Sequence, residues 1–244
     1  LLDASSSPRL CVAALLPFSE GQPDWGSFER MLEWMNRCAQ AFGVEITFVL
    51  NADTGYVFNL SEQLYEEVIT RFRALYPEAS FISGVTAVGA DPEEFRASCY
   101  HPHLDIAQAH APCEVMIMTS QALNGLDPEN RRDAYFEIAE RIQVPALVHA
   151  LEPAFVPWAT PFEPWLLHQL ASHDQFVGGK ISTLDEPHFL HWASMTQHLG
   201  LNFLPHSGDD FGIASAIRMG LPLLIGAGVS ACPLICAAKK YWRK

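Results

Sequence analysis

The sequence predicts an α/β fold: a single (β/α)8 barrel, or TIM barrel, formed by residues 10–244. Apolar, β-branched segments of strand length recur eight times, and stretches with helical periodicity lie between them. The starts of successive strands are separated by 21 to 36 residues, which describes a repeating strand–helix unit. Eight such units favour a closed barrel over an open sheet, which usually has roughly five to seven. Residues 1–9 are expected to form a flexible leader.

The expected strands share runs of buried, branched side chains. They are Leu10–Pro17, Glu45–Asn51, Phe81–Val88, Glu114–Thr119, Ala146–Leu151, Phe176–Ser182, Asn202–His206 and Leu223–Ala227. Between them, the apolar spacing predicts helices over Trp25–Phe42 and Ser61–Leu75. Ser61 is expected to cap the second of these helices, because a serine hydroxyl accepts a hydrogen bond from an unpaired N–H of the first turn.

Glycines and prolines mark where the elements end. Gly43, Gly200 and Gly220 follow helical runs, where a left-handed residue ends a helix at little cost. The segment Glu152–Trp165 contains four prolines and is the longest stretch without predicted secondary structure. Because this density of prolines excludes a regular helix, we expect a shaped loop on the barrel rim after the fifth strand.

Composition excludes several classes of function. The formal charge of -13 argues against a nucleic-acid partner, because such binding depends on clustered Lys and Arg. The apolar stretches are far shorter than the ~20 residues of a membrane helix, so no membrane partner is expected. The six cysteines form no C-x-x-C pair and no metal knuckle, and the N-terminus lacks the pattern of a secretory signal. We therefore expect a cytoplasmic protein with reduced thiols.

One lysine stands out as a candidate nucleophile. Lys180 is the only lysine between Leu1 and Ala238, and it lies in the apolar strand Phe176–Ser182. Burial lowers the pKa of a lysine from ~10.4, and catalytic amines often reach roughly 7 to 8, where the unprotonated amine attacks carbonyl carbons. The alternative is a structural lysine whose stem lies along the core while its ammonium reaches water.

Other polar residues are expected beside this lysine. In a (β/α)8 barrel, the active site lies at the carboxyl ends of the strands, so the residues that close each strand meet at one mouth. They are Asn51, Asp53, Thr54, Thr119, Ser120, Gln121, His149, Lys180, Ser207, Asp209 and Asp210.

The order of the motifs resembles the dihydrodipicolinate synthase and N-acetylneuraminate lyase family of Schiff-base aldolases. Matching segments are Leu16–Phe18, Ala52–Gly55 followed by Leu60–Glu62, Gly178–Ser182, and Ser207–Asp210. The resemblance covers the whole barrel from Leu10 to Lys244, and it stops where family members continue into a C-terminal bundle of helices. The expected fold is therefore a barrel without that bundle, either because the chain is truncated or because the protein differs from the family.

This resemblance implies a function. Lys180 would form an imine with the keto carbon of a 2-oxo acid, typically pyruvate, and the resulting enamine would act as the carbon nucleophile of an aldol or lyase reaction. Thr54 would bind the substrate carboxylate, with backbone N–H groups of the loop at Gly55, and Asp53, Ser207 and Gln121 are further candidate substrate-binding residues. No cofactor is implied. Family members are commonly tetramers built from tight dimers, so a homo-oligomer, a dimer or a tetramer, is expected.

The sequence departs from the family at four positions. Asp53 replaces the first threonine of the Thr-Thr-Gly-Glu turn, and Tyr56 replaces its glutamate. An aspartate there should repel a pyruvate carboxylate unless it is protonated or turned away. His149 replaces the proton-relaying tyrosine of the fifth strand, and the strand-four tyrosine falls near Gln121. His149 is a candidate acid/base group, because an imidazole both accepts and donates a proton near neutral pH.

Two other functions stay open. One is a metal-dependent barrel enzyme that uses Asp53, His149, His206 and Asp209 as ligands. The other is a homologue that binds an oxo acid or sugar acid without turnover. Three remaining groups are expected to be structural: His101–His103 in a solvent-facing turn, His188 and His191 on a wet helix face, and Asp209 and Asp210 as caps of a helix over Phe211–Met219.

Overall fold

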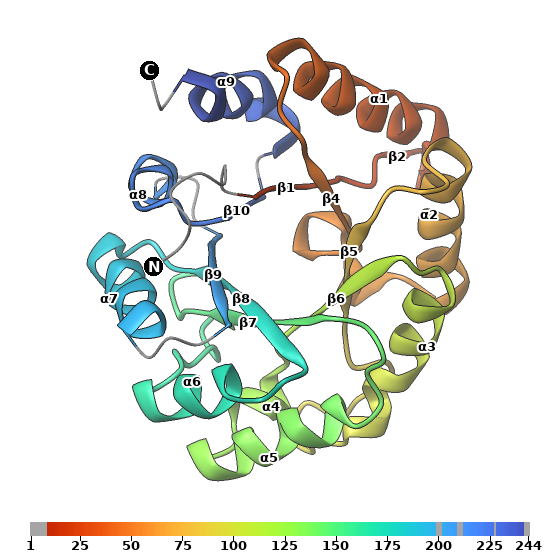
Figure 1. Cartoon of the computed structure of the whole chain (residues 1–244). Helices are drawn as coiled ribbons and strands as arrows, with labels where there is room; N and C mark the ends of the chain where they lie inside the picture. The colour runs from red at the N-terminus through yellow and green to blue at the C-terminus, as the bar shows by residue number, and fades with distance from the viewer. Residues whose placement is uncertain (1–8, 199–201, 209–211, 227, 242–244) are drawn as a thin grey trace.

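The computed structural model describes residues 9–198, 202–208, 212–226 and 228–241. Eight parallel strands close into a barrel in the order β1-β10-β9-β8-β7-β6-β5-β4, with the helices arranged around it (Figure 1). The predicted fold class is confirmed. The barrel strands are β1 (Leu10–Ala13), β4 (Thr47–Leu50), β5 (Phe81–Val85), β6 (Cys113–Ile117), β7 (Ala146–Leu151), β8 (Phe176–Ser182), β9 (Leu204–Ser207) and β10 (Leu223–Ile225).

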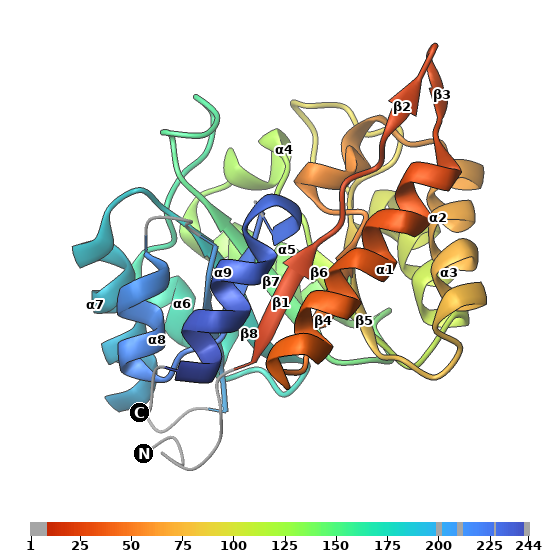
Figure 2. The ribbon, with the colours of Figure 1, turned by 90° about the horizontal axis from the view of Figure 1, so that it is seen from above.

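The α-helices follow the strands along the chain. They are α1 (Trp25–Phe42), α2 (Glu62–Leu75), α3 (His101–Ala109), α4 (Gln121–Asn124), α5 (Pro128–Ala139), α6 (Pro164–Ala171), α7 (Glu186–His198), α8 (Ile213–Met219) and α9 (Gly228–Tyr241). A hairpin of β2 (Phe18–Ser19) and β3 (Gln22–Pro23) projects beyond the strand ends (Figure 2). The 3-10 turns η1 (Asp53–Gly55) and η2 (Val57–Asn59) follow β4, and η3 (Ala97–Tyr100) precedes α3.

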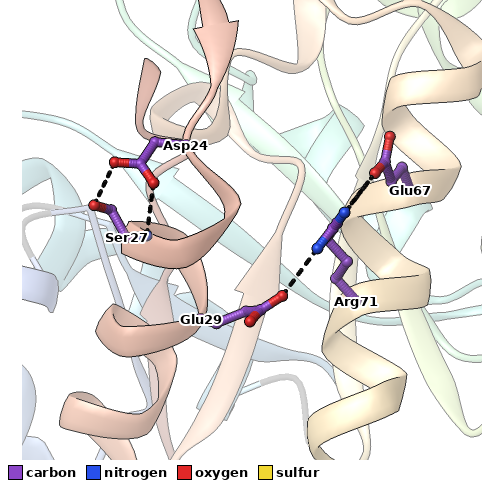
Figure 3. Close-up of polar contacts among 5 residues, drawn as sticks. All are labelled: Asp24, Ser27, Glu29, Glu67 and Arg71. Atoms are coloured by element: carbon purple, nitrogen blue, oxygen red, sulfur yellow. Dashed lines mark hydrogen bonds and ion pairs between the residues drawn. The ribbon is translucent and has the colours of Figure 1, made fainter. Parts of the chain in front are cut away.

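Local contacts explain the first helices. The Asp24 carboxylate caps α1, because it accepts hydrogen bonds from the Ser27 N–H at 2.9 Å and the Ser27 hydroxyl at 2.6 Å (Figure 3). Arg71 on α2 pairs with Glu29 of α1 and with Glu67 of its own helix, each at 3.0 Å (Figure 3). These side chains are about one-third exposed, so the pairs mainly set how the two helices lie against each other.

Most of the predicted helix ends are observed. The Ser61 hydroxyl accepts from the Leu64 N–H, as expected of a simple cap. Gly43 and Gly220 are left-handed, with φ of 63° and 69°. Gly200 lies outside the described residues.

One expectation about local structure is confirmed except at its end, and another is wrong. The predicted loop Glu152–Trp165 is observed as far as Glu163, and α6 begins at Pro164, where a proline in the first turn loses no helical hydrogen bond. The segment His101–His103 is not a solvent-facing turn. It opens α3, and His103 is 1% exposed and stacks on the Tyr65 ring, with centroids 3.9 Å apart.

The strand register places three titratable side chains in one row. His149 on β7 pairs with Lys180 on β8, and Lys180 pairs with His206 on β9. Laterally paired residues share a face of the sheet, and all three side chains are buried. Lys180 Nζ lies 3.0 Å from Asp53 on the turn after β4, which is not a neighbour of β7 or β8, so the row lies inside the barrel.

A close approach of β4 and β5 fixes the start of the turn that follows β4. A Cβ added to Gly84 would lie 2.1 Å from the carbonyl oxygen of Asn51, so only glycine permits this spacing. Asn51 itself is left-handed, with φ of 50°, and its amide donates to the Tyr65 carbonyl oxygen at 3.2 Å. The chain therefore leaves β4 in a defined direction toward Asp53. In the described part of the chain, no helix is long and apolar enough to cross a bilayer.

Candidate active site

Lys180 and Asp53 form an ion pair at the mouth of the barrel. The Lys180 side chain is 8% exposed, and its Nζ donates to Asp53 Oδ2 at 3.0 Å. Asp53 lies in η1, immediately after β4, and its side chain is 35% exposed. The amine thus has a counter-ion that the sequence did not predict. Because Asp53 is partly exposed, the pair lies next to solvent and is not sealed in the core.

Gly208 leaves space for the stem of this lysine. A Cβ at Gly208 would lie 2.9 Å from Lys180 Cγ and 3.0 Å from Cε. The Gly208 N–H donates to the Ile181 carbonyl oxygen at 2.9 Å, which holds the residue after β9 against β8. The backbone therefore supports the lysine along its length and leads the amine toward Asp53.

Asp53 is ionised at neutral pH. Burial alone raises the pKa of the Asp53 carboxyl, but the charge of Lys180 and the hydrogen bond from its amine outweigh burial and hold the pKa below its usual range. The carboxylate points at Lys180 and is not turned away. An aspartate here would tolerate a substrate carboxylate if it were protonated or turned away. Neither condition is met in this structure.

His149 lies beside the pair as a neutral imidazole. It is 0% exposed, and its Nε2 lies 3.1 Å from Ser182 Oγ and 3.8 Å from Asp53 Oδ2. Burial lowers the pKa of His149 to about 4, and the charge of Lys180 acts in the same direction. Its Nδ1 has no hydrogen-bond partner among the residues that the structure describes. A neutral imidazole in this position can accept or donate one proton.

Ser182 was missed by the sequence analysis. It ends β8 two residues after Lys180, so the two side chains lie on the same face of the strand. Its contact with His149 joins β7 and β8 at the mouth. The spacing of two along a predicted strand was the signal that identifies it.

Thr54 offers an unused hydroxyl. Its Oγ1 is buried and makes no hydrogen bond within the described part of the chain. Its methyl carbon would lie 3.6 Å from a Cβ added to Gly226, the residue that follows β10. The Gly55 N–H is already occupied, because it donates to the Ala52 carbonyl oxygen at 2.9 Å. The predicted anchor therefore has its threonine hydroxyl available, but not the amide of Gly55.

The structure does not bring Gln121 and Ser207 to the lysine. Gln121 opens α4 with an exposed side chain, which donates to Glu93 Oε1 at 3.1 Å on the surface. Ser207 is buried and pairs with Ile181, so strand alternation directs it to the face opposite Lys180 and His206. Asp209 and Asp210, predicted as helix caps, lie outside the described residues.

A metal centre from the proposed ligands is not assembled in the described chain. Among residues 9–198, 202–208, 212–226 and 228–241, no three His, Cys, Asp or Glu side chains are grouped to hold a metal ion. His206 is 2% exposed, its Nδ1 donates to the Leu204 carbonyl oxygen at 2.9 Å, and burial lowers its pKa to about 4. Asp209, the fourth ligand of that hypothesis, is not among the described residues.

The sequence also did not predict a second cluster of polar side chains on the barrel rim. Glu152 Oε2 accepts from the Thr183 hydroxyl at 2.6 Å, and Glu152 Oε1 lies 3.1 Å from His188 Nδ1. His188 was expected on a wet helix face, but it is held by this carboxylate. The three residues tie the start of the proline-rich loop to the end of β8 and the first turn of α7.

Together, the fold and the site define a (β/α)8 barrel protein with a lysine–carboxylate pair and a neutral imidazole at its mouth. No protein-family model and no curated protein sequence matches the chain. Solved structures do match it in fold. A monomeric variant of dihydrodipicolinate synthase aligns with a TM-score of 0.79 at 18% identity, over 95% of this chain and 74% of that chain.

Two further solved structures match the chain in fold. Dihydrodipicolinate synthase from Thermotoga maritima aligns with a TM-score of 0.75 at 19% identity, over 96% of this chain and 76% of the other. YagE from E. coli K12, a prophage protein of the dihydrodipicolinic acid synthase family in complex with pyruvate, aligns with a TM-score of 0.79 at 14% identity, over 97% and 75%. At these identities the likeness shows the barrel fold, and the chain spans about three quarters of these proteins' length.

Proposed function

We propose that this protein is a Schiff-base-forming lyase of the aldolase type, and a divergent member of the dihydrodipicolinate synthase and N-acetylneuraminate lyase family. The observation that carries the proposal is the Lys180 amine, which ends inside the mouth of the barrel with a carboxylate at 3.0 Å and a neutral imidazole nearby. The resemblance suggests a 2-oxo acid as substrate, and the structural neighbour YagE is in complex with pyruvate.

The first step requires the amine to lose a proton. Asp53 is the acceptor within reach, at 3.0 Å from Nζ. When a substrate covers the exposed third of Asp53, water leaves and both charges become costlier, which favours transfer of the proton to the carboxylate. The neutral amine then attacks the carbonyl carbon and loss of water gives the imine. The proton held by Asp53 returns to the imine nitrogen, which gives the iminium and restores the carboxylate.

Later steps use the same groups. The protonated imine draws electrons from the neighbouring C–H bond, so a base that accepts this proton produces an enamine. His149 is neutral and lies 3.1 Å from Ser182 Oγ, so these two side chains form the path we assign to that proton. The Thr54 hydroxyl binds the substrate beside the imine. The enamine carbon attacks an aldehyde in the synthetic direction, and the reverse sequence cleaves the product.

A protein that binds the same ligands without turnover is the second candidate. The ion pair favours it, because an ammonium held by Asp53 does not attack a carbonyl carbon unless its proton moves. This candidate predicts that ligands raise the melting temperature but leave Lys180 unmodified. The predicted homo-oligomer, a dimer or tetramer, stays a prediction under either candidate.

Borohydride trapping tests the proposed function. The protein is incubated with a panel of 2-oxo acids and uncharged aldehydes and ketones, reduced with sodium borohydride, and analysed by intact mass and peptide mapping. We expect one adduct per chain, located on Lys180. Lys180→Arg keeps the charge opposite Asp53 and should abolish the adduct, while Lys240→Arg, on the exposed face of α9, should leave it unchanged. An unmodified mass with every compound, or an adduct elsewhere, rejects the proposal.

A further inference from the structure

The charge balance at Lys180 restricts what the amine accepts as substrate. The basic side chains next to the Asp53 carboxylate in the described chain are Lys180, at 3.0 Å, and His149, at 3.8 Å. His149 is neutral at physiological pH, so Lys180 carries the single full positive charge in contact with Asp53. The pair is already balanced before any substrate enters.

Imine formation keeps this balance only for an uncharged substrate. The iminium carries one positive charge, which the Asp53 carboxylate neutralises. A 2-oxo acid adds a second carboxylate on the carbon bonded to the imine carbon, beside an amine that is 8% exposed. Two anions then share one cation in a poorly hydrated position, and like charges so placed repel strongly.

The remaining polar groups at the mouth suit hydroxyl groups. The Asp53 carboxylate only accepts hydrogen bonds, and the Thr54 and Ser182 hydroxyls both donate and accept. The Gly55 N–H is occupied by the Ala52 carbonyl oxygen, so it does not provide the amide donor that a substrate carboxylate needs. Acceptor-rich groups of this kind bind the O–H groups of polyols.

We infer that the carbonyl substrate of Lys180 carries no carboxylate next to its carbonyl group and is an uncharged, hydroxyl-bearing aldehyde or ketone. This inference rests on the proposed imine chemistry at Lys180 and replaces the 2-oxo acid that the resemblance suggests, because Asp53 stands where the family's carboxylate-binding turn has a threonine. The amine and the carbonyl group give the imine and one water, and the proton from the neighbouring carbon passes to the His149 and Ser182 side chains.

A matched pair of probes tests the inference. Pyruvate and hydroxyacetone are both methyl ketones and differ in a carboxylate against a hydroxymethyl group. The rate of borohydride-trapped adduct on Lys180 is measured for each probe with the wild-type protein and with Asp53→Asn, which removes the charge and keeps the shape. We expect hydroxyacetone to label the wild type at least about tenfold faster than pyruvate, and this ratio to fall at least about tenfold in Asp53→Asn.

The outcomes separate the two proposals. If wild-type Lys180 is trapped with pyruvate as fast as with hydroxyacetone, or faster, the inference is overturned while the lyase proposal stands. The same holds if the ratio is unchanged in folded Asp53→Asn. If no compound of the panel, these two probes included, labels Lys180, the proposed function itself fails, and the inference fails with it. The wild-type comparison decides the matter even if the variant does not fold.

Discussion

The environment of each ionisable side chain at the mouth depends on its neighbours. Lys180 and Asp53 are 127 positions apart in the sequence, and each supplies the charge that makes the other tolerable in its position. Removing one partner of such a pair leaves an unbalanced charge in a poorly hydrated place, a cost that the partial exposure of Asp53 reduces. Lys180→Arg is therefore a gentler control than a neutral substitution.

At the residue scale, substitutions of Thr54 distinguish a role in substrate binding from a role in stability. Because its buried hydroxyl makes no hydrogen bond to described residues, Thr54→Val removes nothing that holds the fold, and we expect the free energy of unfolding to change by less than ~1 kcal/mol. If the hydroxyl binds substrate, trapping at Lys180 should slow by about tenfold, the equivalent of ~1.4 kcal/mol. Thr54→Ser keeps the hydroxyl and should retain most of the rate. Equal rates for the two variants would remove Thr54 from the site.

At the scale of secondary-structure elements, the backbone conformation at the strand ends determines where these side chains lie. Asp53 is directed at Lys180 by a short 3-10 turn, whose start is fixed by left-handed Asn51 and by the contact of Gly84 with the Asn51 carbonyl. The site therefore depends on a glycine that never touches it.

Gly84→Ala tests this dependence at the element scale. The added Cβ would meet a backbone oxygen at 2.1 Å, so β4 and β5 must separate, and we expect a loss of roughly 1 to 3 kcal/mol in the free energy of unfolding. Gly125→Ala is the matched control. It has φ of -72°, and its new Cβ would lie 3.4 Å from the nearest atom, so urea unfolding should show a change below ~1 kcal/mol. A similar loss in both variants would contradict the steric argument.

The elements were easier to predict than their contacts. The bounds of α1 follow from its apolar spacing, since a helix needs only local periodicity. The start of α3 was missed because His101–His103 reads as a turn, yet a proline in the first turn suits a helix. The strand ends correctly placed Asp53, Thr54, His149 and Lys180 at one mouth. The ion pair and the outward position of Gln121 depend on turn geometry, which strand periodicity does not encode.

At the scale of the whole molecule, the barrel keeps several histidines uncharged. His103, His149 and His206 are at most 2% exposed, and burial lowers the pKa of each to about 4. They lie in different parts of the fold. His103 on α3 stacks on Tyr65 of α2, whereas His149 and His206 flank Lys180 inside the barrel. Protonation of any of them places a charge where the fold provides little hydration.

This arrangement predicts acid sensitivity well above the range of ordinary carboxyl groups. In the unfolded chain, the histidines titrate near ~6.5, whereas in the folded state their pKa is about 4. Between these values the unfolded state binds more protons, so stability is full above the unfolded pKa and falls as the pH is lowered toward 4. Each histidine then contributes a loss on the order of 3 kcal/mol. The lowered pKa of Asp53 acts in the same direction, but only below its usual value of 3.8.

Urea unfolding at pH 7, 6 and 5 measures this effect. The chain carries a net charge of -13 at pH 7, with a pI near 5.1, so acidification also relieves self-repulsion, which alone would raise stability as the pH falls. A decrease in the free energy of unfolding over this range therefore identifies the buried histidines as the dominant effect. His206→Gln should flatten the decrease, and His191→Gln, on the exposed face of α7, should leave it intact. A constant or rising stability from pH 7 to 5 would show that the barrel hydrates these imidazolium charges.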